Sequence, residues 1–260
     1  MAGLKSYRKE KYMNKAFSNL TTVKELQEYL DEPFHYINKT VAHYTSLDSL
    51  LYILSDRRLK FSCFEKTNDV IECDFVSEET KKKRFFCMMG SAEENFGMWA
   101  MYGGLASKTS ETDKLKSTYV KIKIPVSAVK SFIRKNDLRA NAVAYTRLLE
   151  DKDIKNPLYY FGNRTNRNSI NLDKTALSGY VKDVAWKYER EIRIWSESEY
   201  VSIDDNFINN LEVFPSPVIT HSDCKKLIQN DSRYGKIQNV IEKILKQNKY
   251  EGSFQNCKNV

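Results

Sequence analysis

Patterns typical of β-strands dominate the centre of this chain, whereas patterns typical of helices dominate its two ends. Alternating or short apolar runs predict strands at residues 41–44, 59–64, 84–89, 118–124, 141–145 and 189–195. Few of these strands are separated by a helix, as the βαβ units of a parallel sheet would require. The sequence therefore predicts an α+β fold with a mainly antiparallel sheet.

Helix-forming segments flank this strand-rich centre. Apolar residues recur at helical spacing at 23–30, 47–54 and 236–249. Thr45 and Ser46 directly precede the second segment and supply a typical N-cap. No Pro-, Gly- or Ser-rich linker divides the chain. We therefore expect residues 1–40 to form a helical N-terminal extension and residues 41–260 to form a single domain.

Composition favours a soluble, cytoplasmic protein. The apolar run at 85–89 is among the longest, far below the roughly 18 residues that span a bilayer, and no secretory signal is visible. His221 and Cys224 have the spacing of half a metal motif, but no second pair completes it, so we expect no metal. The irregular spacing of the five cysteines favours reduced thiols; they are Cys63, Cys73, Cys87, Cys224 and Cys257.

The chain is basic, with 42 Lys and Arg against 34 Asp and Glu, a net charge of +8 and a pI near 9.0. Such a charge favours acidic partners such as nucleic acid, nucleotides or an anionic membrane surface, although it also serves solubility alone. One tight basic run consists of Lys81, Lys82, Lys83 and Arg84. This run is either a solvated face or a contact for nucleic-acid phosphates.

Common nucleotide-binding and hydrolase motifs are absent from the sequence. It has no G-x-x-x-x-G-K-[ST] loop, no G-x-G-x-x-G after a strand, no G-x-S-x-G elbow and no H-E-x-x-H. Any nucleotide must therefore be bound by another scaffold.

Residues 43–46 form a first candidate cluster, at a strand end before a helix. His43 there can bond a ribose hydroxyl, and the helix N-terminus favours an anionic phosphate. The alternative is a histidine that is satisfied within the fold.

A second candidate cluster combines Asn68 and Asp69 with Trp99 and Tyr102, which are spaced i, i+3 on a predicted helical turn. The two aromatic rings could stack on a base or a nicotinamide ring. Packing in the protein core is the alternative.

The segment Trp186-x-Tyr188-Glu189-x-Glu191-x-Arg193 is the third and most informative cluster. Its alternation places three charged side chains on one face of the predicted strand. If that face is exposed, the charges are merely solvated, and Glu191 and Arg193 pair with each other. If it lines a cleft, two carboxylates can stabilise a sugar oxocarbenium ion and activate a nucleophile.

Together these clusters resemble a bacterial family of unknown function with the motifs H-Y-T-S, I-L, L-x-F-S, N-D-P-F-E, M-W-S-H-Y and W-x-Y-E-x-E-x-R. The order and approximate spacing agree over about residues 40–245. The sequence departs from the pattern at two places. Val70-Ile71 replaces Pro-Phe of N-D-P-F-E, so the proline that would fix this loop is missing. Ala100-Met101 replaces Ser-His of M-W-S-H-Y, so the second histidine of the motifs has no counterpart here. The corresponding segments are His43-Tyr44-Thr45-Ser46, Ile53-Leu54, Leu59-Lys60-Phe61-Ser62, Asn68-Asp69-Val70-Ile71-Glu72, Met98-Trp99-Ala100-Met101-Tyr102 and Trp186-Lys187-Tyr188-Glu189-Arg190-Glu191-Ile192-Arg193.

This family in turn resembles a branch of the ADP-ribosyltransferase superfamily. That resemblance implies a split antiparallel β-sheet core and cleavage of NAD+, as substrate, at the nicotinamide–ribose bond. It also implies that Glu191 or Glu189 stabilises the oxocarbenium ion, with Glu191 expected to be catalytic because it is the second glutamate of E-x-E. The NAD+-binding residues would be His43, Tyr44, Thr45, Ser62, Asn68, Asp69, Trp99, Tyr102 and Arg193.

The resemblance leaves the acceptor of ADP-ribose open between nucleic acid and protein. Many bacterial members of the superfamily act as toxins or phage-defence effectors, which would imply an antitoxin or inhibitor protein as a partner. The net charge, the basic run and sixteen tyrosines favour nucleic acid, RNA before DNA, and we expect no membrane partner. The alternatives are an NAD+ glycohydrolase, a non-catalytic nucleic-acid-binding or regulatory protein on the same fold, and a structural protein that uses its C-terminal helix.

Overall fold

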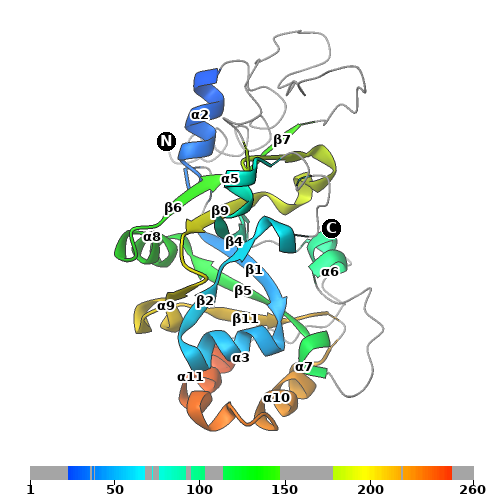
Figure 1. The fold of residues 1–260 in the computed structure, drawn as a ribbon. Helices are drawn as coiled ribbons and strands as arrows, with labels where there is room; N and C mark the ends of the chain where they lie inside the picture. Colours follow the sequence, from blue (N-terminus) through cyan, green and yellow to red (C-terminus); the bar gives the residue numbers. More distant parts are fainter. Residues whose placement is uncertain are drawn as a thin grey trace, which may run out of the picture. The chain divides into compact units, whose positions relative to one another are not determined.

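The computed structural model confirms an α+β protein with mainly antiparallel strand pairing (Figure 1). It describes residues 23–35, 37, 39–67, 72, 76–91, 95–102, 114–146, 178–217 and 219–247. The chain divides into two compact units, each made of three separate segments. Unit 1 comprises residues 1–38, 61–90 and 137–199, and unit 2 comprises residues 39–60, 91–136 and 200–260. The single domain expected for residues 41–260 stays a prediction.

Unit 1 is built on four antiparallel strands in the order β3–β4–β9–β6. The register places Cys87 of β4 and Asn141 of β6 on either side of Arg193 in the central strand β9. A short parallel pair, β7 and β8, completes its strands. The strands are β3 (Ser62–Cys63), β4 (Arg84–Met89), β6 (Arg139–Ala142), β7 (Ala144–Thr146), β8 (Val181–Asp183) and β9 (Glu191–Ser196). The helices are α2 (Val23–Asp31), α5 (Glu78–Lys81) and the 3₁₀ helices η1 (Phe64–Lys66) and η3 (Val184–Glu189).

An aromatic cluster forms part of the core of unit 1. The Phe64 ring lies 4.5 Å from the Phe85 ring, and Trp195 packs 5.5 Å from Phe85. Tyr180 adds a further ring 5.4 Å from Trp195. Large buried rings contribute most of the apolar area per residue, so this cluster stabilises the end of β9 against β4.

Unit 2 contains a three-stranded antiparallel sheet, β1–β5–β11, and a separate two-stranded ribbon, β2–β10. Its strands are β1 (Thr40–Ser46), β2 (Arg58–Lys60), β5 (Tyr119–Pro125), β10 (Tyr200–Ser202) and β11 (Glu212–Pro215). Its helices are α3 (Leu47–Asp56), α6 (Phe96–Tyr102), α7 (Lys114–Ser117), α8 (Val126–Lys135), α9 (Asp205–Asn209), α10 (His221–Gln229) and α11 (Tyr234–Gln247).

The helical predictions for unit 2 are confirmed. Ser46 caps α3, because its side chain accepts a hydrogen bond from the backbone N–H of Ser49, and Arg57 ends the helix in the left-handed conformation. The predicted apolar stripe of α3 is buried. α11 buries Ile237, Ile241 and Ile244 and contacts α3 and β11 (Figure 1).

Strand predictions were confirmed for 41–44, 84–89 and 118–124, which correspond to β1, β4 and β5. The prediction of one strand over 59–64 was wrong. Leu59 belongs to β2, which pairs with β10, whereas Ser62 belongs to β3, which pairs with β4. The break falls at Phe61, whose side chain is fully buried and whose N–H donates to the carbonyl of Glu199 at 2.7 Å. Residues 141–145 likewise divide between β6 and β7 at Val143.

Within the described part of the chain, no helix is long and apolar enough to cross a bilayer.

Candidate functional site

The strand predicted over 189–195 begins two residues late, at Glu191. Glu189 is instead the last residue of η3, which Asp183 caps by accepting from the N–H of Ala185. Arg190 lies between them in the left-handed conformation (φ 44°), so the strand alternation does not extend back to Glu189. The carbonyl of Arg190 accepts from the N–H of Gly90 at 2.7 Å, and a Cβ on Gly90 would lie 3.0 Å from that oxygen. A side chain at this position would therefore require a small shift of the Arg190 backbone.

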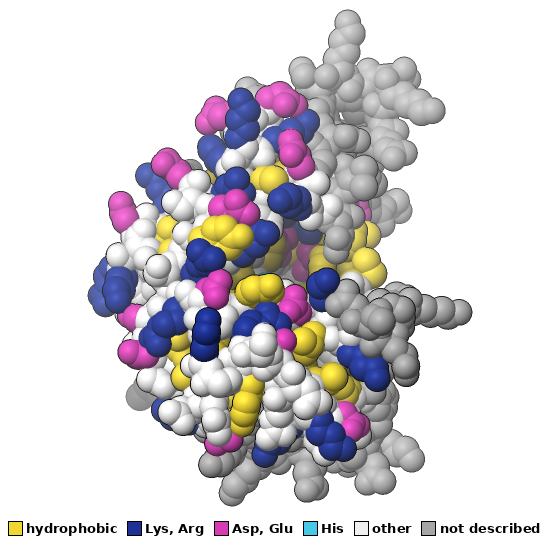
Figure 2. All heavy atoms as spheres, turned by 60° about the horizontal axis from the view of Figure 1, so that its bottom comes forward, with side chains coloured by type: hydrophobic (Ala, Val, Ile, Leu, Met, Phe, Trp, Pro, Cys, Tyr) yellow, Lys and Arg dark blue, Asp and Glu magenta, His cyan; other side chains and the backbone are white. Residues whose placement is uncertain are grey.

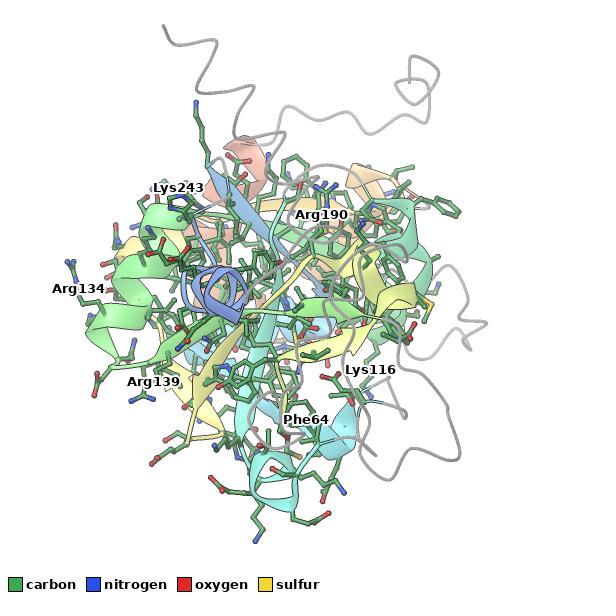
Figure 3. All side chains as sticks on the ribbon, turned by 90° about the horizontal axis from the view of Figure 1, so that it is seen from above. Phe64, Lys116, Arg134, Arg139, Arg190 and Lys243 are labelled. Atoms are coloured by element: carbon green, nitrogen blue, oxygen red, sulfur yellow. The ribbon has the colours of Figure 1, made fainter. Side chains whose placement is uncertain are left out.

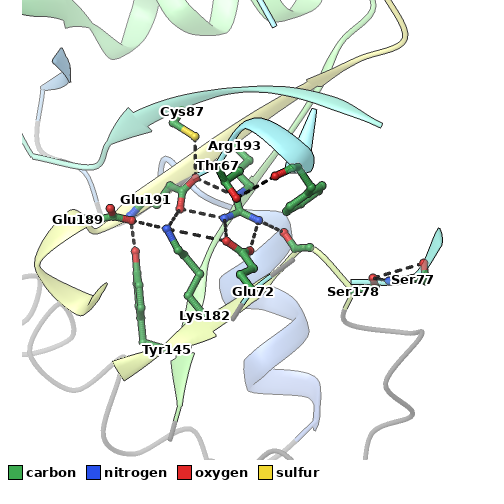
Figure 4. Close-up of polar contacts among 12 residues, drawn as sticks. Thr67, Glu72, Ser77, Cys87, Tyr145, Ser178, Lys182, Glu189, Glu191 and Arg193 are labelled. Atoms are coloured by element: carbon green, nitrogen blue, oxygen red, sulfur yellow. Dashed lines mark hydrogen bonds and ion pairs between the residues drawn. The ribbon is translucent and has the colours of Figure 1, made fainter. Parts of the chain in front are cut away.

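Three carboxylates and two cations meet inside unit 1 (Figure 4). This group, here named the charge cluster, consists of Glu72, Lys182, Glu189, Glu191 and Arg193. Each of the five residues is between 1% and 5% exposed. The charged side chains of the segment 186–193, which were predicted to be either solvated or lining a cleft, are thus buried. A buried charge is very unfavourable unless partners of opposite charge or hydrogen bonds compensate it.

Arg193 uses all five of its N–H donors in the charge cluster. Nη1 donates to Glu72 Oε1 at 2.6 Å and to the carbonyl of Gly179 at 2.7 Å. Nη2 donates to Glu72 Oε2 at 2.9 Å and to Glu191 Oε2 at 3.0 Å, and Nε donates to Glu191 Oε1 at 2.8 Å. The planar guanidinium therefore binds the carboxylates of Glu72 and Glu191 at the same time, each through two hydrogen bonds (Figure 4).

Lys182 is the second cation and touches all three carboxylates. Its Nζ lies 2.6 Å from Glu189 Oε2, 3.2 Å from Glu191 Oε2 and 3.9 Å from Glu72 Oε2. The same Nζ lies 5.0 Å from the centre of the half-buried Trp186 ring, within cation–π range.

Two neutral side chains also contact Glu191. The Cys87 thiol donates to Glu191 Oε1 at 2.7 Å, and the backbone N–H of Glu191 donates to the Tyr145 hydroxyl at 2.8 Å. Burial raises the pKa of the Cys87 thiol, and the neighbouring Glu191 charge raises it further. Burial and Glu191 likewise raise the pKa of Tyr145. Both groups therefore stay neutral at pH 7.

The charge cluster shifts the pKa values of its carboxyl groups in opposite directions. Burial by itself raises the pKa of Glu191, but the charges of Arg193 and Lys182 outweigh burial and lower it. For Glu72 burial dominates and raises the pKa, although Arg193 opposes it. Burial lowers the pKa of Lys182, but Glu191 and Glu189 raise it more. Glu191 is therefore held as an anion beside a charged lysine.

The other predicted NAD+-binding residues lie in several elements. Ser62 is half-buried in β3, opposite Phe85, and belongs to unit 1. In unit 2, His43, Tyr44 and Thr45 are in β1. Asn68 and Asp69 lie outside the described residues. The roles assigned to all of these residues stay predictions.

Trp99 and Tyr102 lie on α6, as the spacing predicted. The Trp99 ring is buried and packs edge-on against Tyr44, with ring centres 4.8 Å apart and planes at 82°. Trp99 therefore makes a packing contact within the protein, which was the alternative to stacking on a base or a nicotinamide ring.

The basic run at 81–84 is compensated locally by acidic side chains. Lys81 lies 2.6 Å from Glu78, Lys83 lies 3.3 Å from Glu79, and Arg84 lies 3.9 Å from Glu199. Lys82 and Lys83 are exposed. These pairs weaken the case for this run as the main phosphate contact.

Sequence reasoning missed four residues of the site: Glu72, Cys87, Tyr145 and Lys182. Glu72 was detectable, because it is the last residue of the quoted segment Asn68–Glu72 and pairs with the last residue of the segment Trp186–Arg193. Lys182 and Tyr145 carried no signal, since only the fold brings them beside Glu189 and Glu191.

Among the described residues, no group of three or more His, Cys, Asp and Glu side chains is arranged to hold a metal ion.

Comparison with known families supports the resemblance to a family of unknown function. A family model described as "Protein of unknown function (DUF2971)" matches residues 98–194. The matched part contains Trp99, Tyr102, Lys182, Glu191 and Arg193. No curated protein and no solved structure matches the chain significantly.

Proposed function

We propose that this chain is an ADP-ribosyltransferase that takes NAD+ as its substrate, on a fold of that superfamily. The observation that carries the proposal is the charge cluster, in which Glu189 and Glu191 share one lysine in a buried environment. The predicted E-x-E pair therefore supplies two carboxylates at one place, although it does not do so from one strand.

Cleavage of NAD+ needs such negative charge. The bond from ribose C1′ to the nicotinamide nitrogen breaks, and its electron pair leaves with nicotinamide, which becomes neutral. The ribose then carries oxocarbenium character, which a carboxylate stabilises best where water is excluded. A nucleophile on the acceptor forms the new bond to C1′ and loses a proton. The charge cluster carries three negative charges against two positive ones when all its groups are ionised, so it favours a developing cation.

We propose nucleic acid, with RNA first, as the acceptor. Seven of the eight excess positive charges lie in unit 2, which has twenty Lys and Arg against thirteen Asp and Glu. Arg134 at the end of α8 is an exposed member of this excess and extends outward (Figure 3). On the face drawn in Figure 2, basic and acidic side chains are interspersed, so net charge alone does not single out a binding surface there.

The ribbon β2–β10 offers a more specific surface in unit 2. Its exposed face, here named the ribbon face, consists of Arg58, Lys60 and Tyr200, with the tyrosine 44% exposed. Arg58 lies 4.3 Å and Lys60 lies 5.9 Å from the centre of the Tyr200 ring. Asp56 pairs with Arg58 at 3.0 Å, so the arginine is partly compensated. An aromatic ring between cations suits a stacked base and its phosphates.

The ribbon face also favours a second candidate function, a non-catalytic nucleic-acid-binding protein. This candidate predicts steeply salt-dependent binding to RNA or DNA without release of nicotinamide. If the enzyme acts as a bacterial toxin or defence effector, a neutralising protein partner is part of the proposal.

The test uses NAD+ labelled in its adenylate half, incubated with the protein and, in separate reactions, with RNA, DNA and cell extract. Nicotinamide release is followed in parallel, with a Glu189→Gln/Glu191→Gln double variant as the control. Label in RNA that the double variant does not produce is the expected result. Nicotinamide release with no labelled macromolecule would replace the transferase by an NAD+ glycohydrolase. Neither signal from folded protein would contradict the enzyme and favour the second candidate.

A further inference from the structure

Two of the exposed large hydrophobic side chains in the described part of the chain are tyrosines that pack on an arginine. Tyr52 of α3 is 55% exposed, and Tyr200 of β10 is 44% exposed. The Arg233 guanidinium lies 4.3 Å from the centre of the Tyr52 ring. The Arg58 guanidinium lies at the same distance, 4.3 Å, from the centre of the Tyr200 ring. Unit 2 therefore carries the same arrangement, an accessible ring beside a cation, at two places.

The two tyrosines lie on connected elements. α3 contacts both α11 and β2, the strand that begins with Arg58 (Figure 1). Tyr52 and Asp56 are spaced i, i+4 on α3, so they share one face of that helix. Asp56 in turn pairs with Arg58 at 3.0 Å. A series of neighbouring side chains thus joins the Tyr52 ring to the Tyr200 ring.

Arg233 fixes the Tyr52 ring rather than offering its charge to a ligand. Its Nη2 donates to Asp48 Oδ1 at 2.6 Å and to Asp231 Oδ2 at 2.9 Å. Its Nε donates to Asp231 Oδ1 at 2.7 Å, and its side chain is only 17% exposed. Tyr52 is therefore held by a cation that is itself fixed and compensated. A ligand that stacks on this ring meets a surface that is already ordered, which lowers the entropic cost of binding.

Exposed cations lie beside and between the two rings. They are Arg58, Lys60 and Lys236. The hydrogen bond from Ser55 lowers the pKa of Asp56, and the charges of Arg58 and Lys236 lower it further, so both cations lie near this carboxylate. Exposed ion pairs are weak, so a phosphate can compete with Asp56 for them. Rings that stack on bases and cations that contact phosphates together suit a single-stranded nucleic acid.

We propose that one single strand of nucleic acid, RNA before DNA, binds across this surface with one base stacked on Tyr52 and another on Tyr200. The surface, here named the two-tyrosine surface, adds Tyr52, Arg233 and Lys236 to the ribbon face. The proposal rests on the proposed acceptor, RNA, and deepens it. It does not depend on the cleavage of NAD+.

The geometry selects an unstacked strand. Stacked neighbouring bases are about 3.4 Å apart. One helical turn, about 5.4 Å, already separates Tyr52 from Asp56, and Arg58 lies between Asp56 and Tyr200. The two rings therefore take bases that are not neighbours in a stack. A duplex keeps its bases stacked and paired, so it cannot present two of them to the rings.

The experiment measures binding of a fluorescein-labelled oligouridylate of about ten nucleotides by anisotropy, at one salt concentration and without NAD+. We expect Tyr52→Ala and Tyr200→Ala each to weaken binding roughly tenfold, and the double variant roughly 100-fold, because each ring loses one base. Phe96→Ala is the matched control, since Phe96 is an aromatic residue of unit 2 that is 76% exposed. Its loss should change the affinity by less than about twofold.

An abasic ribose–phosphate oligomer of the same length separates stacking from charge. It should bind the wild type and the two tyrosine variants with equal affinity, because it has no base to stack. Tyr52→Leu keeps an apolar contact for Arg233 and replaces Tyr52→Ala if the alanine variant has a lowered Tm. The same roughly tenfold loss is expected from it.

Wild-type affinity of the double variant for the oligouridylate would overturn the proposal. Single variants that bind like wild type, with a loss only in the double variant, would also overturn it, because the strand would then use either ring and not both. Weaker binding of the abasic oligomer by the tyrosine variants would assign the loss to something other than stacking. Duplex RNA that binds as tightly as the single strand would contradict the selection of unstacked bases.

The proposed enzyme fails in a different way. Folded wild-type protein that binds the strand through both tyrosines but releases no nicotinamide from NAD+ contradicts the enzyme and leaves the two-tyrosine surface to the second candidate function. Wild-type protein that cleaves NAD+ but binds no single-stranded RNA overturns the two-tyrosine surface and leaves the enzyme in place.

Discussion

Arginine and lysine have opposite environments in the charge cluster of unit 1 and on the ribbon face of unit 2. In the charge cluster, Arg193 is 1% exposed and each of its donors has a protein acceptor. On the ribbon face, Arg58 and Lys60 are exposed and lie over an exposed tyrosine. Buried cations are tied to the fold because an unpaired charge there is very unfavourable, whereas exposed cations can exchange water for a ligand. Sequence composition counts both kinds alike.

The largest expected effect is the loss of Arg193. Arg193→Leu leaves Glu72 and Glu191 buried without their main cation, so the free energy of unfolding should fall by about 3–5 kcal/mol. Urea unfolding followed by circular dichroism measures this fall. Arg58→Leu is the matched control, with no measurable change expected. Equal losses in the two variants would remove the distinction between the two regions.

The next effect is the acid sensitivity that Glu191 confers. Because its folded pKa lies below the ordinary value of 4.5, Glu191 stabilises the fold above pH 4.5, and this stability is lost as pH falls through the folded pKa. Glu72 acts with the opposite sign, because its pKa is raised. Urea unfolding at pH values from 4.5 downward should therefore show a shallower loss of stability in Glu191→Gln than in wild type. A loss as steep as that of wild type would argue against a charged Glu191.

Gly179 offers a backbone test of the charge cluster. Its φ is +84°, and a Cβ would lie 2.9 Å from Thr80 Cγ2 and 3.0 Å from the Phe64 and Trp195 rings. Its carbonyl accepts from Arg193 at 2.7 Å, so a shift of the backbone also disturbs that bond. Gly179→Ala should lower the free energy of unfolding by about 2 kcal/mol or more, measured in urea. Gly235→Ala is the control, because a Cβ there meets nothing within 4 Å.

The smallest effect is expected on the ribbon face, in binding rather than in stability. Tyr200→Ala should weaken binding of single-stranded RNA by roughly tenfold, because a stacked base is lost, and should leave Tm nearly unchanged. Fluorescence anisotropy at several salt concentrations measures the affinity and its salt dependence. Lys243→Ala, an exposed lysine on α11, is the comparison. Equal weakening by both changes would indicate attraction by net charge alone.

The sequence predicted the elements whose pattern is local. The capped helix after Ser46, the strand at 84–89 and the apolar stripe of α11 all followed from spacing. The start of β9 did not, because a left-handed Arg190 and the close approach of Gly90 interrupt the alternation. Lys182 beside Glu189 could not be predicted either, since a contact that depends on the packing of β8 leaves no periodic signal. Glu72 and Arg193 both belong to motifs found in the sequence, but the ion pair between them is seen only in the structure.

Nicotinamide release from NAD+ by the wild-type protein and the Glu189→Gln/Glu191→Gln double variant, each shown to be folded, tests the central claim most directly. The account predicts release by the wild type and by the control Glu197→Gln, whose glutamate is exposed just after β9, and a rate lower by about 10²–10³-fold in the double variant. Folded wild-type protein that releases no nicotinamide, with or without RNA present, would contradict an ADP-ribosyltransferase centred on the charge cluster.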